Sequence, residues 1–266
     1  MGDIEKKTTA QVKEFGGQLK EMPTDMRIFS LTMRSLYAEK AVGTNGELAK
    51  RLWEMCDKTR DDALVYLRGI LAISAVFVAS ISEYLEYYEA LEYEEWVDMI
   101  SDILEETVGY RGLCEAVLKM HEDIMVPSKR RKEEANLMAR ELLASLTRVS
   151  LIPALDRFLG GLANAAGFFS MMEQQLRKFE GHAEKAQGAP KKLYYKVMNK
   201  EGKDMKSFCQ IFYAVLSDVK TDFLAIPQDG TDRNYVDRWL ENQKKTIREK
   251  CNVTKHVQKL LKAITD

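Results

Sequence analysis

The sequence contains few of the residues on which common catalytic and metal-binding motifs depend. Only three histidines occur among 266 residues, and none has an acidic residue three positions before or after it. That spacing excludes the helical Glu-x-x-His pair of di-iron bundles, and no His-Glu-x-x-His zinc motif occurs. Neither a Gly-x-Ser-x-Gly nucleophile elbow nor a Gly-Lys-Ser/Thr phosphate loop is present. We therefore expect a protein that is not an enzyme and uses no metal or cofactor. A catalytic site assembled from residues distant in the sequence stays open.

Cysteine is also scarce, and its spacing fits neither a zinc site nor a disulfide framework. The four cysteines are separated by 58, 95 and 42 residues. We expect free, buried thiols at Cys56, Cys114, Cys209 and Cys251. The first fifteen residues carry charged side chains instead of the apolar run of a signal peptide. The expected location is the cytoplasm, with peripheral attachment to a membrane as an extension.

Proline is rare, and this favours long helices. The chain has 5 prolines, and none lies between Thr24 and Val126. Apolar residues recur three and four positions apart, whereas alternating runs joined by a tight turn are missing. The sequence predicts an all-α protein, an elongated antiparallel helical bundle with long central helices. The predicted helices are 8–22, 24–42, 46–108, 112–125, 130–180, 203–225 and 232–263.

The helix boundaries are predicted from proline and glycine. Pro23 and Pro127 each lack a backbone N–H, and Gly109 and Gly112 admit non-helical backbone angles, so each is expected to mark the end of a helix. Pro153 lies inside an otherwise helical pattern, where it is expected to produce a kink.

The same residues divide the chain into three parts. Residues 1–180 are predicted to form the main helical bundle. Residues 181–202 contain four of the glycines and prolines and are predicted to form a connecting segment. Residues 203–266 are predicted to form a C-terminal helical pair packed on the bundle.

Charge is distributed unevenly along the chain. Residues 1–176 contain 21 basic and 29 acidic side chains, a net charge of −8, whereas residues 177–266 contain 19 basic and 12 acidic side chains, a net charge of +7. No Lys or Arg occurs from Gly69 to Tyr110, and the segment from Glu83 to Glu106 holds ten carboxylates. We expect this acidic face to pair with the basic C-terminal helices in the folded bundle.

Two segments carry no charge at all. Residues 69–82 and residues 158–172 are 14 and 15 residues long, shorter than the roughly 20 residues that span a bilayer as a helix. We expect both to be central, buried helices. Each contains small residues at spacings of three and four, which let helix backbones approach closely, so the two segments are predicted to pack against each other. The stripes are Ala72, Ala75, Ala79, Ser82 and Gly160, Ala163, Gly167, Ser170.

The second segment suggests a function at membranes. Its three glycines each weaken a helix by about 1 kcal/mol relative to Ala, so the segment is able to rearrange. Storage of an uncharged segment in a helical bundle is similar, in outline only, to α-helical pore-forming proteins. The preferred interpretation is therefore a bundle that engages or permeabilises membranes. The candidate membrane-contact residues are Ile73, Val76, Phe77, Phe158, Leu162, Gly167, Phe168 and Phe169.

Two basic regions are candidates for binding an anionic surface. One is the run after Pro127, and the other lies in the predicted C-terminal helix. For the C-terminal helix, pairing with the acidic face competes with lipid binding. The candidate residues are Lys129, Arg130, Arg131, Lys132, Lys244, Lys245 and Arg248.

The alternative interpretation is a cytoplasmic scaffold or adaptor that binds partner helices and never contacts lipid. It would use the Glu- and Tyr-rich segment at 83–96 or the basic C-terminal helix. A helical dimer that binds curved membranes is a third interpretation, disfavoured by the balanced total charge. The expected partner is thus membrane lipid or a partner helix, homo-oligomer formation stays open, and no nucleic acid is expected.

Overall fold

The computed structural model describes residues 2–38, 46–142, 152–188, 191–224, 231–251 and 254–265. Over these residues the chain is helical apart from short turns, with no strand, so the all-α prediction is confirmed. The elements are α1 (Gly2–Ala38), α2 (Gly46–Val65), the π-helix η1 (Tyr66–Leu71), α3 (Ala72–Glu89), α4 (Tyr93–Asp98), α5 (Ile100–Leu142), α6 (Ile152–Ala186), α7 (Lys191–Leu224), α8 (Arg233–Lys250) and α9 (Thr254–Thr265).

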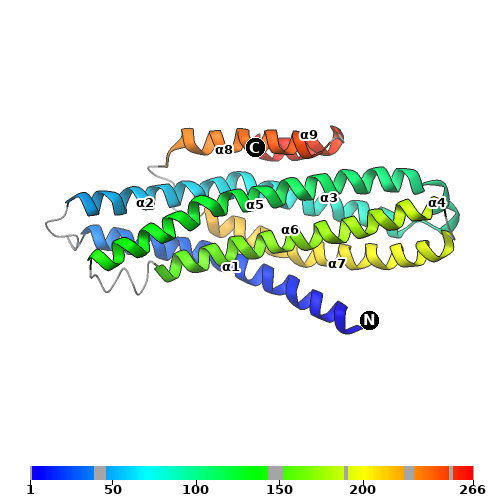
Figure 1. Ribbon diagram of the computed structural model, residues 1–266, viewed down its shortest axis with the longest axis horizontal. Helices are drawn as coiled ribbons and strands as arrows, with labels where there is room; N and C mark the ends of the chain where they lie inside the picture. The colour runs from blue at the N-terminus through cyan, green and yellow to red at the C-terminus, as the bar shows by residue number, and fades with distance from the viewer. Residues whose placement is uncertain are drawn as a thin grey trace.

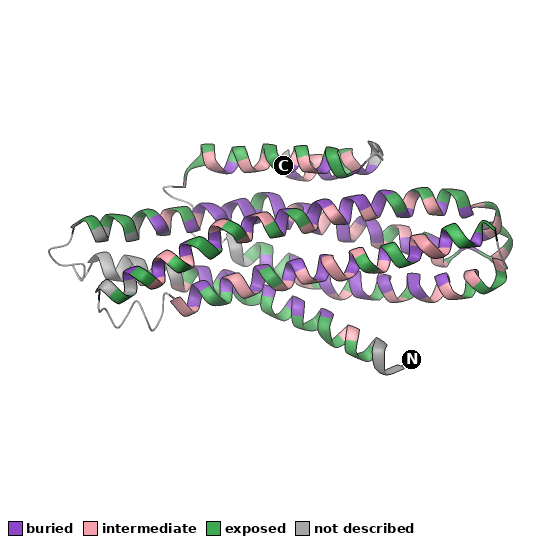
Figure 2. Ribbon diagram, in the orientation of Figure 1, coloured by how far each residue is buried: buried purple, intermediate pink, exposed green. Residues whose placement is uncertain are grey.

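The long helices lie along one axis and form the elongated bundle that the sequence predicts (Figure 1). Helix α6 packs between α1 and α5, and α7 packs against α1 and α3. The helices α2, η1 and α3 follow one another without a break, and α8 and α9 lie outside them as an additional layer (Figure 1). Buried residues face the inside of the bundle, while much of α8 is exposed (Figure 2).

Three predicted helix ends are wrong. Helix α1 continues through Pro23, and α5 continues through Gly109, Gly112 and Pro127. A proline inside a helix removes one backbone hydrogen bond, but packing of a buried face supplies most of the stability of a helix in a protein. Pro23 follows the fully buried Met22 and is itself buried, so tertiary packing holds the helix together at this position.

The predicted helix at 46–108 is divided by a reversal of the chain. Helix α3 ends at Glu89, and α4 begins after Glu92, which forms a capping box with Glu95. Beyond this turn, α5 runs antiparallel to α3. The hydroxyl of Tyr84 lies 3.1 Å from the hydroxyl of Thr107, within hydrogen-bonding distance across the two helices.

The predicted helix at 130–180 is also two helices. Helix α6 begins at Ile152, so Pro153 lies in its first turn. Backbone N–H groups in the first turn have no acceptor within the helix, so the N–H that proline lacks costs no hydrogen bond there. The predicted kink at Pro153 is therefore wrong. Ion pairs between Arg111 and Glu180 and between Lys132 and Asp156 connect opposite ends of α5 and α6, which run antiparallel.

The predicted connecting segment at 181–202 is mostly helical. Helix α6 extends to Ala186, and α7 begins at Lys191. Because α7 packs against α1, α3 and α6, it belongs to the bundle instead of the C-terminal pair. The pair of helices that lies on the bundle consists of α8 and α9.

Aromatic rings fill much of the core. Phe168 of α6 stacks on Phe212 of α7 with ring centroids 3.8 Å apart, and Phe77 of α3 lies 5.8 Å from Phe169 of α6. All four rings are fully buried. The prediction of buried thiols without a disulfide is confirmed for the three cysteines of which the structure describes the side chains; the Cys56 side chain lies outside that part. The confirmed three are Cys114, Cys209 and Cys251.

Candidate functional site

The most distinctive feature of the bundle is one apolar helical stretch. Among the described residues, Asp57–Glu89 alone is long and apolar enough to cross a membrane, judged by length and composition. Its most apolar 18-residue window has a mean hydropathy of 2.1, and 72% of that window is buried. A core helix of a soluble protein meets the same criterion. The stretch Asp57–Glu89 is longer than the uncharged run at 69–82 because it also includes the end of α2 and the remainder of α3. These parts and η1 form one continuous helix.

Helices α8 and α9, which we name the outer layer, cover this apolar stretch. The backbone at Gly69 approaches α8 so closely that an added Cβ would lie 2.8 Å from Leu240 and would overlap the side chain of Gln243. At the end of α8, a Cβ on Gly112 of α5 would overlap the carbonyl oxygen of Lys250. Two glycines thus permit the outer layer to lie directly against η1 and α5.

A buried carboxylate ties the outer layer to the bundle. Asp62 of α2 is fully buried and accepts a hydrogen bond of 2.6 Å from the hydroxyl of Tyr235 in α8. It also pairs with Arg131 of α5. The adjacent Asp61 accepts a hydrogen bond from the backbone N–H of Asp232 at 2.8 Å. Burial raises the pKa of Asp61, and that hydrogen bond partly opposes the shift.

The acidic face pairs with the basic C-terminal part of the chain, as predicted. In α9, His256 lies 2.7 Å from a carboxylate oxygen of Glu106, and Lys259 lies 3.0 Å from Glu83. In α7, Lys206 pairs with Glu89 at 2.7 Å, which lowers the pKa of that carboxyl. The basic residues of α8 behave differently, since two of its lysines pair within their own helix. These pairs are Lys244 with Glu241 and Lys245 with Glu249.

The candidate membrane-contact residues lie inside the bundle. In the first segment Val76 is half-buried, and in the second Gly167 is half-buried. The others are fully or almost fully buried: Ile73, Phe77, Phe158, Leu162, Phe168 and Phe169. The prediction that the two uncharged segments are central and buried is therefore confirmed, and contact with lipid from these positions requires the bundle to open.

The two uncharged segments contact each other through the rings of Phe77 and Phe169, but their small-residue stripes do not form the close helix contact that was predicted. Helix α3 packs mainly on α7 and α9, while α6 packs on α1 and α5. A Cβ added at Gly167 would lie 2.9 Å from the ring of Phe15 in α1, and one at Gly160 would lie 3.8 Å from Gln18. The glycines of α6 accommodate large side chains of α1 instead.

The candidate anionic-surface residues have different environments. Lys129, Arg130 and Arg248 are exposed. Arg131 is buried through its ion pair with Asp62, so its assignment to an exposed basic surface is wrong. The signal that the sequence analysis missed is the helical spacing, which places Arg131 on the face of Ser128 and Ala135, both buried. Lys132 is half-buried and pairs with Asp156.

A buried histidine lies between η1 and α6. His121 of α5 contacts the ring of Tyr66 in η1 and that of Phe169 in α6, with centroids 5.7 and 4.9 Å apart. Its Nδ1 bonds the carbonyl of Val117 at 2.9 Å, while Nε2 has no partner among the described residues. Burial lowers the pKa of His121 to about 4. Its apolar neighbours Val117 and Ile124, four before and three after it, are the sequence signal for this burial.

Within the described residues, no group of three or more His, Cys, Asp or Glu side chains is arranged to hold a metal ion. Comparison with known proteins gives no further assignment, because no family model, curated protein or solved structure matches the chain.

Proposed function

We propose that this protein engages membranes by moving its outer layer away from the apolar stretch Asp57–Glu89. The observation that supports this proposal is the combination of a stretch long enough to span a bilayer with a cover made of the polar helix α8 and the amphipathic helix α9. A helix this apolar is ordinarily closed in by other apolar surfaces. Here one side of it is closed by α8, which buries Val236 and Ile247, packs Trp239 and Leu240 on the core, and also buries the polar Gln243.

In this proposal the outer layer separates first, because polar contacts supply part of its attachment beside the buried Val236, Ile247, Leu260 and Ile264. Its contacts include the hydrogen bond of Tyr235 to Asp62 and the pairs of His256 and Lys259 with Glu106 and Glu83. The exposed pair of Lys259 with Glu83 contributes little net stability, because both groups regain contacts with water when they part. The bond of Tyr235 to the buried Asp62 is the stronger polar contact, worth about 1.5–3 kcal/mol. In addition, the amide oxygen and nitrogen of the buried Gln243 have no hydrogen-bond partner among the described residues.

Separation would also free positive charge. The lysines and arginines of α8 and α9 would then lie on helices detached from the acidic face, where anionic lipid headgroups attract them. Exposure of the apolar stretch and release of a basic helical pair would therefore occur together. The segment at 158–172 follows in a second stage, because it lies deeper, between α1, α5 and α7.

The test is to loosen the outer layer without changing its charge. Gly112→Ala introduces a Cβ that overlaps the backbone of Lys250, whereas Gly181→Ala, the matched control, introduces one with nothing within 4 Å. Both substitutions favour a helix by about 1 kcal/mol. We expect Gly112→Ala to increase binding to anionic vesicles in flotation, and to increase dye release at neutral pH and at about pH 5.

Gly181→Ala should leave both readouts at the level of the unmodified protein. Absence of binding and leakage for all three proteins would reject the membrane proposal. That result would favour the scaffold alternative, which at present has less support. Much of the Glu- and Tyr-rich surface is already occupied, since Tyr88 is buried, and Glu83 and Glu89 are paired within the chain.

A further inference from the structure

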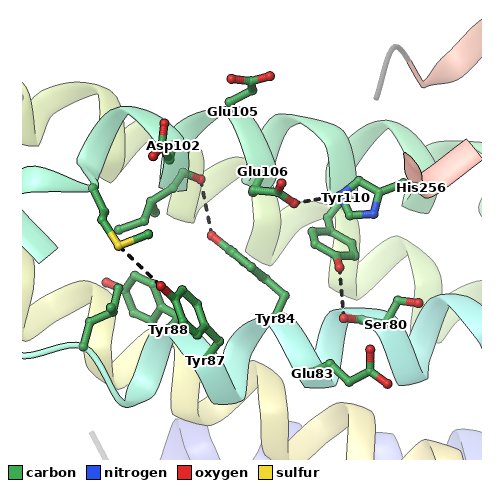
Figure 3. Close-up of a pocket in the computed structure, with 13 residues that line it drawn as sticks. Ser80, Glu83, Tyr84, Tyr87, Tyr88, Asp102, Glu105, Glu106, Tyr110 and His256 are labelled. Atoms are coloured by element: carbon green, nitrogen blue, oxygen red, sulfur yellow. Dashed lines mark hydrogen bonds and ion pairs between the residues drawn. The ribbon is translucent and has the colours of Figure 1, made fainter. Parts of the chain in front are cut away.

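A cleft of about 520 Å³ opens where α3, α5 and α9 meet (Figure 3). Tyrosine rings and carboxylates from α3 and α5 line it, and His256 of α9 closes one end. Leu91, Met99 and Ile103 add apolar surface. The volume is within the range of small-ligand sites, which combine apolar walls with a few polar groups.

The charged residues that line the cleft are carboxylates, of which Glu83 and Glu106 are already paired with Lys259 and His256 of α9. The residues that line it include Glu83, Asp102, Glu105 and Glu106, and they include no Lys or Arg. Among the described residues, Asp102 and Glu105 form no ion pair, and both are exposed. An anionic ligand is therefore repelled, and a cationic one is attracted.

The tyrosine hydroxyls are already engaged by the protein. Tyr84 donates to the carbonyl of Ile103 at 3.3 Å, and Tyr110 donates to the carbonyl of Ser80 at 3.0 Å. Burial raises the pKa of both phenols, which keeps them neutral. Tyr88 accepts a hydrogen bond of 2.8 Å from the indole of Trp96. These residues present aromatic rings to a ligand, and rings of this kind attract organic cations through their π-electrons.

One polar group in the cleft lacks a partner. Ser80 lines the cleft and is 3% exposed, and its hydroxyl oxygen forms no hydrogen bond with any described residue. An unpaired buried hydroxyl is costly, so a group that bonds it would stabilise the site. This is an observation separate from the acidic charge, and it indicates a ligand with a polar atom beside its cationic centre.

We propose that the cleft between α3, α5 and α9 binds a small organic cation of the quaternary ammonium class, with a hydroxyl or ester oxygen that bonds Ser80. The N-methyl groups would lie among the tyrosine rings, and the carboxylates of Asp102 and Glu105 would balance the charge. Choline has this chemistry, either as a free molecule or as the headgroup of a lipid. Because the cleft exists in the closed bundle, this inference does not depend on release of the outer layer.

Ligand-observed NMR provides the test. In a saturation-transfer experiment, choline and tetramethylammonium should show saturation transferred from the intact protein. The neutral isostere of choline, with carbon in place of nitrogen, should show little. Tyr87→Leu and Glu105→Gln should each weaken choline binding by roughly fivefold. The matched controls Tyr213→Leu on α7 and Glu133→Gln on α5, both exposed and outside the cleft, should leave it unchanged.

Ser80→Ala should weaken binding of choline by about threefold and leave tetramethylammonium unaffected, because only choline carries the hydroxyl. Flotation with phosphatidylcholine vesicles identifies the source of the ligand. Binding that free choline competes away indicates a lipid headgroup, and binding of choline without vesicle binding indicates a soluble cation. Equal binding of the neutral isostere, or no saturation of choline, would overturn the proposal.

Discussion

The two uncharged segments have similar lengths and compositions, but the fold surrounds them differently. Residues 69–82 lie in the helical body that α8 and α9 cover on one side, and their remaining neighbours include α7. Residues 158–172 lie in α6, between α1 and α5, with Phe168 stacked on Phe212 of α7. The two sequences do not distinguish the segments. The helices that cover each segment therefore determine how easily it becomes exposed to solvent or lipid. Removal of the cover should expose the first segment before the second.

The largest expected effect is on the enclosed segment. Phe168→Ala removes a fully buried ring that stacks on Phe212 at 3.8 Å. Loss of a buried phenylalanine typically lowers the free energy of unfolding by about 3–5 kcal/mol. We expect denaturant unfolding to show this loss as one global transition, with α6 and α7 losing hydrogen-exchange protection together. Early exchange confined to α6 would contradict its enclosed position.

The pH dependence of stability should depend on the buried His121, which lies between η1 and α6. The pKa of His121 is about 4 in the folded protein, below its ordinary value of 6.5, so the unfolded chain takes up a proton first as the pH falls. The contribution of His121 to the free energy of unfolding is complete above pH 6.5. It decreases by about 3 kcal/mol in total as the pH falls toward 4.

Urea denaturation across this range measures that loss, and His121→Leu should flatten the curve. Asp25 and Asp61 act in the opposite direction, because their raised pKa values let the folded state bind protons more readily than the unfolded chain. The difference between the unmodified protein and His121→Leu therefore isolates the histidine. An identical pH profile for both proteins would remove His121 as the titrating group.

A smaller effect is expected where the outer layer is attached. Tyr235→Phe removes the 2.6 Å hydrogen bond to the buried Asp62 and should cost about 1.5–3 kcal/mol, because the acceptor is a carboxylate. Hydrogen exchange should accelerate in α8 and in the covered stretch at 57–89 while α6 keeps its protection. Tyr213→Phe, on the exposed face of α7, is the matched control and should change neither. Equal acceleration in α6 would show that the two segments open together.

The smallest effect concerns the exposed pair between α9 and α3. Lys259 and Glu83 lie 3.0 Å apart, with side chains 48% and 71% exposed, so solvent screens their attraction. Lys259→Met should lower the free energy of unfolding by roughly 0.5 kcal/mol or less. Added salt should have little further effect on this variant. A loss of several kcal/mol would mean that this pair carries much of the attachment of α9.

The predictions from sequence succeeded where periodicity and total charge were sufficient. The spacing of apolar residues predicts helices throughout, and the unequal charge of the two parts of the chain predicts the pairing of Glu83 and Glu106 with α9. They failed where one residue was taken to end a helix. Pro23 and Pro127 lie inside continuous helices because neighbouring helices support them, and the sequence alone does not show which helices are neighbours.

The candidate sites show the same limit. The basic run at 129–132 is one feature in the sequence, yet the fold buries Arg131 against Asp62 and leaves Lys129 and Arg130 in solvent. The cleft was not predicted either, because its walls come from three helices, and the unpaired hydroxyl of Ser80 is recognisable only once its surroundings are known.

The sequence by itself determined the helical class and the burial of the two uncharged segments, because helical periodicity and hydrophobicity are properties of local sequence. Only the tertiary structure decided which helix covers which segment, where His121 lies and which carboxylates share a cleft. Those outcomes depend on contacts between residues far apart in the chain. The stripe of small residues in α6 illustrates this: it permits close packing but does not specify the partner, which is α1.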